Sequence, residues 1–317
     1  MTSAASDAFA LAAGAAPLQE LRLDWLTAHG ISLAVLRLDL VDPELSGNKW
    51  FKLSQHLVAA HLNRAPGLIS LGGAHSNHLH ALAAAGRRFS LHTVGLLRGV
   101  AQDTPTVRDL QRFGMQLHWL GYGGYRARHR ADFWEPWLQH YPEYRCIPEG
   151  GGGLAGALGC VPLVAQLQAR LGDIGWTGYD ALWLAVGTGT TLAGLVIGEA
   201  GRHPVFGALA GPPSHAVPAN LARLLAEAGM ANAGYQLVDA SRDGFGRFDA
   251  ELANFMLQTE RVGGVPLEPV YTAKALLALR LRIEAGDFSA GTRLIFVHTG
   301  GLQGRRAAEA QLQQLGG

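Results

Sequence analysis

Three segments of this 317-residue sequence combine residue types that can act as nucleophiles or bind anions. The first runs from Ser46 through Gly47 and Asn48 to Lys49, at the start of an apolar stretch. Burial of the Lys49 amine there would lower its pKa toward the neutral, nucleophilic form. The alternative interpretation is a lysine in a surface loop, where most lysines lie.

The second segment, from Leu71 to His78, runs from an expected strand end through a turn into an expected helix start. Backbone amides at a helix N-terminus, supplemented by Ser76 and Asn77, can bind a carboxylate. Ser76 is equally suited to cap the helix without binding any ligand. Both interpretations remain open at this point.

Histidines at positions 75, 78 and 80 raise the question of a metal site, because imidazole is a common ligand. The spacing of His75, His78 and His80 does not match the helical i, i+4 pair with a nearby carboxylate that zinc proteases use. We therefore expect no metal at these residues.

The third segment follows the apolar run 181–186 and precedes an expected helix. Glycines that let the backbone wrap closely, together with threonine hydroxyls and a helix N-terminus, predict a phosphate-binding turn. The residues concerned are Gly187, Thr188, Gly189, Thr190 and Thr191. A nicotinamide-dinucleotide fingerprint would need a third glycine at position 192, which is leucine. A tight turn without a ligand is the remaining alternative.

Two further residues have chemically useful side chains near expected element ends. Tyr271 is a candidate for proton transfer or an aromatic packing residue. Thr299, at the end of the last expected strand, is a candidate hydrogen-bond partner of a ring nitrogen or of a backbone group.

Composition limits the partners and the compartment. The 26 Lys and Arg residues nearly balance the 25 Asp and Glu residues, so no field gathers nucleic acid or an anionic membrane. Cys146 and Cys160 are the only cysteines, which favours a reducing cytoplasm. The apolar stretch 9–16 is too short for a membrane span and no other run approaches about 20 apolar residues, so we expect a soluble protein with a small-molecule partner.

Short apolar runs alternate with longer Ala- and Leu-rich segments, which predicts an α/β fold with a mostly parallel sheet. The expected strands are 67–71, 92–97, 116–120, 181–186, 205–209, 236–239 and 293–298. The expected helices are 77–88, 105–113, 155–170, 191–200, 215–228, 248–261 and 272–284. The segment 121–144 lacks a clear period and is interpreted as an exposed connection. Glycine-rich turns after several of these elements suggest one shared crevice.

Taken in order, these segments resemble the family of 1-aminocyclopropane-1-carboxylate deaminases and D-cysteine desulfhydrases, pyridoxal-phosphate enzymes of the tryptophan-synthase-β-like fold. The resemblance covers residues 38–304. Its most specific parts are Gly47 to Lys49 with Lys52 and Leu53, Gly72 to His78, Ile147 to Gly151 with Gly156 to Gly159, Pro269 to Lys274, and His298 to Gly301.

The resemblance implies a role for each matching residue. Lys49 would form the Schiff base with pyridoxal 5'-phosphate and move a proton at the substrate. Residues 187–191 would hold the phosphate, Asn77 the phenolic oxygen, and Thr299 would face the pyridine nitrogen. The substrate carboxylate would lie against Ser76, also a candidate catalytic residue, and against the backbone of His75, Asn77 and His78. Tyr271 would be the acid–base group.

Three positions depart from the family pattern. A glutamate that follows the matching tyrosine in the deaminases is Thr272 here, which favours β-elimination over opening of a cyclopropane ring. A second active-site tyrosine is replaced by Phe245, which we expect to line the substrate site without a hydroxyl. Loss of such a donor can cost about 1 to 3 kcal/mol. His75 stands where glutamine is common in the family.

These observations predict two domains, a large one (residues 1–48 and 150–317) that holds the phosphate and a small inserted one (residues 49–149). The expected reaction is β-elimination from D-cysteine or a related small amino acid, in a cytoplasmic homodimer. The alternatives are 1-aminocyclopropane-1-carboxylate deamination, a pyridoxal-phosphate-binding protein without this activity, and a nicotinamide oxidoreductase.

Overall fold

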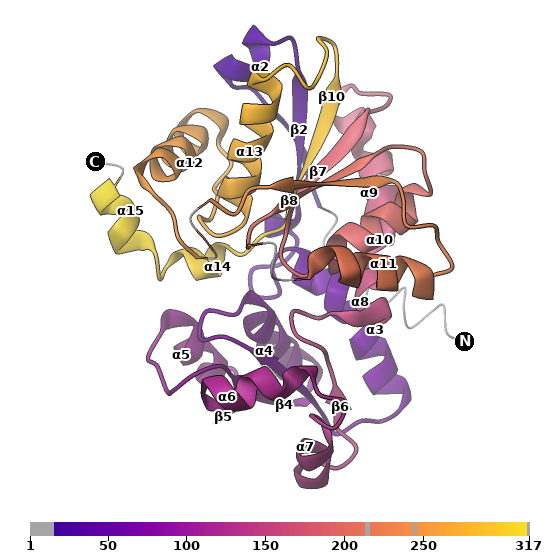
Figure 1. Cartoon of the computed structure of the whole chain (residues 1–317), viewed down its shortest axis with the longest axis vertical. Coiled ribbons are helices and arrows are strands. Elements are labelled where there is room, and N and C mark those ends of the chain that lie inside the picture. Colours follow the sequence, from indigo (N-terminus) through magenta and orange to yellow (C-terminus); the bar gives the residue numbers. More distant parts are fainter. Residues whose placement is uncertain (1–15, 213–215, 243, 245, 316–317) are drawn as a thin grey trace.

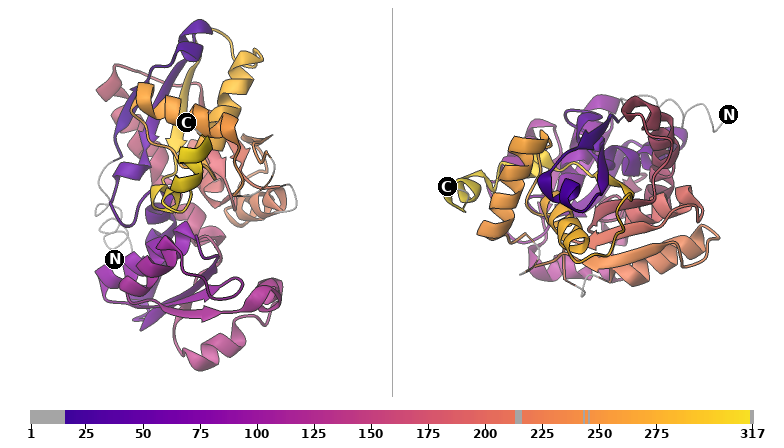
Figure 2. Two further views of the ribbon diagram at one scale, coloured as in Figure 1. Left: turned by 90° about the vertical axis from the view of Figure 1, so that its left-hand side faces the viewer. Right: turned by 90° about the horizontal axis from the view of Figure 1, so that it is seen from above.

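The computed structural model describes residues 16–212, 216–242, 244 and 246–315. Within these ranges the chain forms two β-sheets accompanied by helices (Figure 1). The two sheets occupy separate lobes, one above the other in Figure 1 and in the left panel of Figure 2.

The larger sheet has six strands in the order β1-β2-β10-β7-β8-β9. Strand β1 pairs antiparallel with β2, and all other pairs are parallel. The strands are β1 (Leu18–Leu21), β2 (Ser32–Arg37), β7 (Ala181–Val186), β8 (Val205–Leu209), β9 (Tyr235–Asp239) and β10 (Arg293–His298). The parallel register brings the carboxyl ends of β2, β10 and β7 to one edge.

The smaller sheet has four parallel strands in the order β5-β4-β3-β6. These are β3 (Gly67–Gly72), β4 (His92–Leu97), β5 (Gln116–Trp119) and the very short β6 (Arg145–Cys146). All four come from one continuous part of the chain, whereas the six-stranded sheet takes strands from both sides of that part.

Helices fill the connections between strands. The α-helices are α2 (Asp24–Ala28), α3 (Asn48–Leu62), α4 (Asn77–Phe89), α5 (Pro105–Arg112), α6 (Gly121–Arg126), α7 (Glu135–His140), α8 (Gly153–Cys160), α9 (Pro162–Arg170), α10 (Thr190–Glu199), α11 (Val217–Glu227), α12 (Ala250–Gly263), α13 (Thr272–Glu284), α14 (Leu302–Arg305) and α15 (Glu309–Leu315). Short 3-10 turns are η1 (Leu38–Leu40), η2 (Ala127–His129) and η3 (Leu171–Ile174).

Local sequence explains the central elements. Strand β7 is apolar throughout and buried at every position, as expected for a parallel strand covered on both faces. Helix α4 begins after Ser76, whose side chain accepts a hydrogen bond from the amide of Leu79. Helix α5 begins with Pro105 after the capping residue Thr104.

A continuous hydrophobic core joins the two lobes. One buried cluster includes Leu68 of β3, Leu53 of α3, Leu163 of α9 and Leu182 of β7. Helices α3 and α8 make the most extensive helix–helix contact in this cluster. The two sheets are therefore held together by apolar packing as well as by the chain crossings.

The expected α/β class with two mostly parallel sheets is confirmed, and four strands and helix α13 have the expected bounds. The expected single helix 155–170 is wrong, because Pro162 begins a second helix there. The interpretation of 121–144 as an exposed connection is also wrong. This segment contains α6, η2 and α7, and its side chains Tyr125, Phe133 and Tyr141 are buried against β3 and β4.

The helical stretch 153–174 is long and apolar enough, by length and composition alone, to cross a membrane. It is broken into α8, α9 and η3, and α8 and α9 pack against α3 and α10. The same composition is expected of an interior helix pair in a globular chain.

Candidate active site

The predicted site residues lie where parallel strands end and helices begin. Strand β7 leads into the turn at Gly187–Gly189, β10 leads into Thr299, and β3 leads into the loop before α4. Lys49 is the second residue of α3. Ligands of open α/β sheets bind at such carboxyl edges.

The amine of Lys49 is connected to the predicted phosphate turn through one residue. Lys49 Nζ donates to Asn48 Oδ1 at 2.9 Å, and Asn48 Nδ2 donates to Thr191 Oγ1 at 2.9 Å. Burial lowers the pKa of Lys49 to about 8, against a smaller opposing electrostatic effect of Cys160 and Glu268. The neutral, nucleophilic form of this amine is therefore far more populated near neutral pH than in an ordinary lysine, at about a tenth of the molecules at pH 7.

Gly47 allows the segment before Lys49 to cross the end of β10. Gly47 has a φ of 72°, and a Cβ on it would lie 2.2 Å from the carbonyl oxygen of Thr299. The next residue, Asn48, donates its amide to the same oxygen at 3.1 Å. Only glycine fits this contact, which fixes Thr299 beside the start of α3.

The turn after β7 carries hydroxyls and lies against the buried amine of Lys52. Thr188 Oγ1 lies 3.0 Å from Thr190 Oγ1, and Lys52 Nζ donates to Thr188 Oγ1 at 3.3 Å. Asn220 Nδ2 donates to the Thr188 carbonyl at 2.6 Å. Gly189 has a φ of 83° and α10 begins directly after it, so the helix N-terminus points at the same place.

Lys52 is a functional candidate that the sequence analysis did not assign. It is only 2% exposed, and burial together with the charge of Lys49 lowers its pKa well below the ordinary value. Lys49, Lys52 and His56 follow one another at spacings of three and four residues on α3. This periodicity places all three on one helix face and was a signal available in the sequence.

Two buried histidines extend this basic cluster. Ser70 Oγ donates to the carbonyl of Ile147, so His78 Nε2, 2.8 Å away, must donate to Ser70. His56 Nε2 donates in the same way to the carbonyl of Gly152 at 3.1 Å. The Nδ1 atoms of both rings are buried without a hydrogen-bond partner among the described residues. Burial lowers both pKa values, that of His56 to about 4.

The loop before α4 combines capping with space for a ligand contact. Ser76 caps the helix by accepting from Leu79, which leaves its own hydroxyl hydrogen free of that bond. Asn77 Oδ1 accepts from Gln303 Nε2 at 2.9 Å, and His75 is exposed. His80 contacts Asp109 at 3.2 Å. Across the described ranges, no group of three or more His, Cys, Asp and Glu side chains is arranged to hold a metal.

Tyr271 lies against the phosphate turn. Its ring atom Cε1 is 3.1 Å from the position that a Cβ on Gly187 would occupy, so glycine permits this approach. Burial raises the pKa of Tyr271, and the charges of Glu268 and Glu149 act in the same direction. The phenol therefore keeps its proton at neutral pH.

Glu268 is a second functional candidate that the sequence analysis missed. It is 2% exposed, and its carboxylate accepts from the amides of Val270, Tyr271 and Thr272 at 2.7 to 2.9 Å. Burial raises its pKa, while these amide hydrogen bonds oppose the change. The position of Glu268 next to Tyr271 depends on a tight turn that its sequence context does not reveal.

The structure thus brings together most of the predicted residues: Lys49 contacts Asn48, which contacts Thr191, Tyr271 packs on Gly187, and Thr299 lies against Gly47. Phe245 lies outside the described residues.

These residues fit pyridoxal phosphate. The cofactor needs an amine of lowered pKa for its aldehyde and a cationic, hydroxyl-lined pocket for its phosphate. Lys49 provides the first, and Lys52 with the hydroxyls of Thr188 and Thr190 provides the second. The hydrogen-bond partners of the two amines are the neutral side chains of Asn48 and Thr188, so neither amine is held by a carboxylate through these contacts and an incoming anion can bind there.

Comparison with known proteins gives curated relatives of similar length. The chain is 28% identical over 286 residues to a putative 1-aminocyclopropane-1-carboxylate deaminase of Pyrococcus abyssi, covering 87% of this chain and 86% of that protein. It is 28% identical over 300 residues to a protein of the same name from Thermotoga maritima, covering 90% and 93%. It is 26% identical over 298 residues to a D-cysteine desulfhydrase of Salmonella schwarzengrund, covering 86% and 87%.

Solved structures share the fold. A crystal structure of an ACC deaminase homologue superposes with a TM-score of 0.82 at 24% identity, over 95% of this chain and 93% of that one. A threonine deaminase from Solanum lycopersicum superposes with a TM-score of 0.68 at 13% identity, over 99% and 87%. Residues 10–300 match the family described as pyridoxal-phosphate dependent enzyme. The chain belongs to this family of pyridoxal-phosphate dependent enzymes, and pyridoxal phosphate is its cofactor.

Proposed function

We propose that this enzyme is a lyase that catalyses β-elimination from D-cysteine or a related small amino acid. With D-cysteine, one molecule of water is consumed and pyruvate, ammonia and hydrogen sulfide are released. The observation that carries the proposal is the hydrogen-bonded chain from the Lys49 amine through Asn48 to Thr191, which joins a nucleophile to a phosphate-binding turn.

Residues at the end of β10 and before α13 favour elimination. Thr299 is neutral and cannot fix a proton on a ring nitrogen as a carboxylate would. The nearby carboxylate of Glu268 is already occupied by three backbone amides of its own turn. Thr272, where the deaminases carry glutamate, donates its hydroxyl toward Glu268. A ring nitrogen that faces a neutral threonine favours expulsion of a good leaving group at the β-carbon over reactions that need a fully delocalised carbanion.

When bound, pyridoxal phosphate withdraws electrons from the bonds at the substrate α-carbon. Lys49 would carry the cofactor and move the α-proton, because its amine has the lowered pKa that such a base needs. Ser76 and the first amides of α4 would orient the substrate carboxylate. Tyr271, which keeps its proton, would serve as the acid next to the leaving group.

The organisation of the chain supports a proposed division into two domains. Residues 49–149 would form the small domain, and residues 1–48 with 150–317 the large one. All strands of the four-stranded sheet fall in the first range, and all strands of the six-stranded sheet fall in the second. Helix α3 belongs to the small domain by this division, although it packs against α8 of the large one. A cytoplasmic homodimer completes the proposal.

Reduction of the cofactor-bound protein with borohydride, followed by peptide mapping, tests the attachment residue. The sequence has only three lysines, Lys49, Lys52 and Lys274, so the labelled peptide identifies the residue directly. We expect label on Lys49. Label on Lys52 or Lys274 would contradict the proposed site.

Product analysis tests the reaction. We expect pyruvate from D-cysteine and from β-chloroalanine, with the lysine variant Lys49→Ala as the inactive control. Formation of 2-oxobutanoate from 1-aminocyclopropane-1-carboxylate would instead support the second candidate activity, which the names of the relatives from Pyrococcus and Thermotoga favour. No product from any of these substrates would reject both activities.

Phe245 motivates a third possibility, a cofactor-binding protein that lacks this turnover, because the family resemblance implies a tyrosine at this position. The variant Phe245→Tyr would distinguish the cases. We expect it to increase pyruvate formation about tenfold, the effect of one restored hydrogen bond to substrate. Unchanged turnover would mean that the hydroxyl is not what limits this enzyme.

A further inference from the structure

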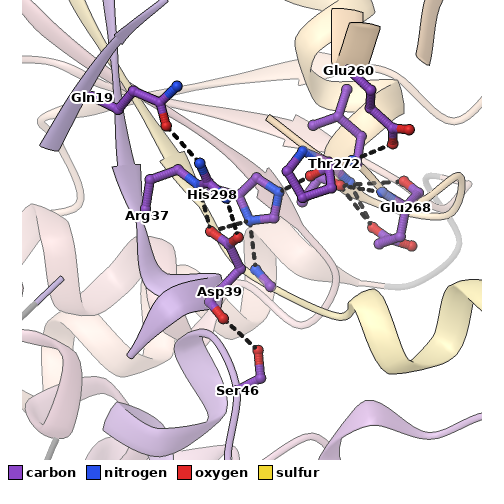
Figure 3. Close-up of polar contacts among 11 residues, drawn as sticks. Gln19, Arg37, Asp39, Ser46, Glu260, Glu268, Thr272 and His298 are labelled. Atoms are coloured by element: carbon purple, nitrogen blue, oxygen red, sulfur yellow. Dashed lines mark hydrogen bonds and ion pairs between the residues drawn. The ribbon is translucent and has the colours of Figure 1, made fainter. Parts of the chain in front are cut away.

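A buried network of polar and charged residues lies next to the candidate site, at the ends of β2 and β10. The strand register pairs Arg37 with His298. Arg37 donates to both carboxylate oxygens of Asp39, at 2.9 and 2.6 Å, and to Gln19 Oε1 at 2.6 Å. The side chains of Arg37 and Asp39 are 6% and 0% exposed. Figure 3 shows His298 between this pair and the turn that contains Glu268.

Hydrogen-bond geometry fixes the protonation of His298. Its Nε2 lies 2.7 Å from the carbonyl oxygen of Pro266, which can only accept, so Nε2 carries a hydrogen. Its Nδ1 accepts from the amide of Gly300 at 3.2 Å, so Nδ1 carries a lone pair. The ring is therefore neutral. Burial lowers the pKa of His298, which agrees with this state, although Asp39 lies 3.3 Å from Nδ1.

Asp39 Oδ1 still has a lone pair that could accept from the ring, but the charge of the Asp39 carboxylate is already compensated by Arg37, which donates to both of its oxygens. A protonated His298 would have to displace the Gly300 amide in order to donate to Asp39 from Nδ1. The bidentate pair with Arg37 keeps the negative charge of Asp39 compensated without that proton. The ion pair therefore preserves the neutral ring and with it the Gly300 hydrogen bond.

The two partners of His298 belong to segments that carry site residues. Gly300 has a φ of 79° and follows Thr299, and a Cβ on it would lie 2.6 Å from the Cα of Gly47. Gly47 precedes Lys49 in the same turn. Pro266, on the other side of the ring, begins the segment that leads through Glu268 to Tyr271. One imidazole thus joins the backbone beside Lys49 and Thr299 to the backbone before Tyr271.

We propose that His298 is a positioning residue of the cofactor site, which acts by holding the Gly300 amide through Nδ1 and so fixes Thr299 against the start of α3. The inference rests on the proposed function, because it assumes that Thr299 faces the cofactor ring. It assigns no contact between His298 and the cofactor. The essential interaction is the one at Nδ1, and the Nε2 contact with Pro266 serves mainly to fix the tautomer.

Two amide variants separate the two ring nitrogens. The side-chain oxygen of His298→Asn can occupy the place of Nδ1 and accept from Gly300, whereas the side-chain nitrogen of His298→Gln can occupy the place of Nε2 and donate to Pro266. Both variants lose one buried hydrogen bond and a ring, so we expect similar decreases in melting temperature. We expect only His298→Gln to change the cofactor site.

The measurement is a pyridoxal-phosphate titration of each purified variant, followed by the visible absorption band and the dissociation constant. We expect about tenfold weaker binding and a displaced band for His298→Gln, the size of one buried hydrogen bond, and values close to wild type for His298→Asn. His80→Gln is the control for loss of a buried histidine, since His80 is 5% exposed and contacts Asp109.

Equal binding constants and spectra for His298→Asn and His298→Gln would overturn the inference, as would a larger defect in His298→Asn. These outcomes would leave the proposed function intact, provided that the wild-type protein binds the cofactor at Lys49. A wild-type protein that binds no pyridoxal phosphate would instead reject the proposed function, and the inference with it.

Discussion

Arg37 and Lys52 are two buried basic residues with different kinds of partner. Arg37 is paired with a carboxylate, and Lys52 with a neutral hydroxyl. Arg37 is 5% exposed and is held by both oxygens of Asp39 and by Gln19. Lys52 is 2% exposed, and its hydrogen bond in the described part of the chain is to the hydroxyl of Thr188 at 3.3 Å. Arg37 is thus compensated by a carboxylate of the chain, whereas Lys52 has no carboxylate partner among the described residues.

The difference separates a structural charge from a functional one. A buried cation without a counter-charge is unfavourable, and a folded chain retains it where an external anion supplies the missing charge. The surroundings of Lys52 agree with this interpretation, because burial also lowers the pKa values of its neighbours Lys49, His56 and His78, and no carboxylate of the described chain compensates Lys52 there. The Arg37–Asp39 ion pair, in contrast, lies at the ends of β2 and β10 and has a structural role.

The largest effect is expected at Lys49, whose amine is not part of an ion pair with any residue that the structure describes. Lys49→Ala should lower turnover by about 10²- to 10⁴-fold or more, because it removes both the attachment point and the base. The fold should be retained, since the amine is not part of an ion pair. Activity assays and borohydride labelling measure the change. Full labelling of another residue in this variant, with activity preserved, would contradict the comparison.

The second-largest effect is expected at the Arg37–Asp39 ion pair and concerns the free energy of unfolding. Asp39→Asn should lower the free energy of unfolding by about 3 to 5 kcal/mol, because it leaves the charge of Arg37 buried and uncompensated. Urea denaturation of the cofactor-free protein measures it. Asp103→Asn is the matched control, since its pair with Arg108 is exposed and its loss should change little. A small effect at Asp39 would remove the distinction between the two cations.

The sequence predicted the reactive residues better than the residues that hold them. Lys49 and the threonines of residues 188–191 were predicted because their types and their position near glycines are informative locally. Asp39, Glu268 and His298 are decisive only through contacts with segments far away in the chain, such as Pro266 or Tyr271. No single-segment pattern carries that information.

The same distinction applies to the fold. Strands β4, β7, β8 and β10 were predicted with correct bounds because each is a continuous apolar run between turn residues. Strand β2 was missed because a short apolar run next to a 3-10 turn does not distinguish a strand from a helix. Strand β6 has two residues and exists only through its pairing with β3. Its sequence has no period to detect.

A third experiment sharpens the contrast at Lys52 itself. Lys52→Met should leave the stability of the cofactor-free protein unchanged or increased, because it removes a buried basic group that has no carboxylate partner within the described ranges. It should weaken pyridoxal-phosphate binding about ten- to hundredfold, the effect of one charged hydrogen bond to the phosphate. Thermal melts and cofactor titration give the two values.

Lys274→Met is the control for Lys52→Met, because Lys274 is also buried but donates to the carbonyls of Ser241 and Gly244. We expect it to lower stability and to leave the cofactor affinity close to wild type. If Lys52→Met destabilised the cofactor-free protein as strongly as Lys274→Met, Lys52 would be a structural cation like Arg37.

The smallest expected effect is a pH dependence that Lys49 contributes and Arg37 does not. Burial lowers the pKa of Lys49 to about 8, below the value of 10.5 for the free amine, so between these values the native state binds fewer protons than the unfolded state. The stability of the cofactor-free protein should therefore rise from pH 8 to pH 10.5.

Covalent capture of pyridoxal phosphate by Lys49 should accelerate about tenfold between pH 7 and pH 9, as the neutral fraction of the amine grows. Arg37 stays charged throughout this range, so its ionisation contributes nothing to the pH profile of capture. A profile that keeps rising beyond pH 10 would show that Lys49 has the pKa of an ordinary surface lysine and is not desolvated, which would contradict the comparison.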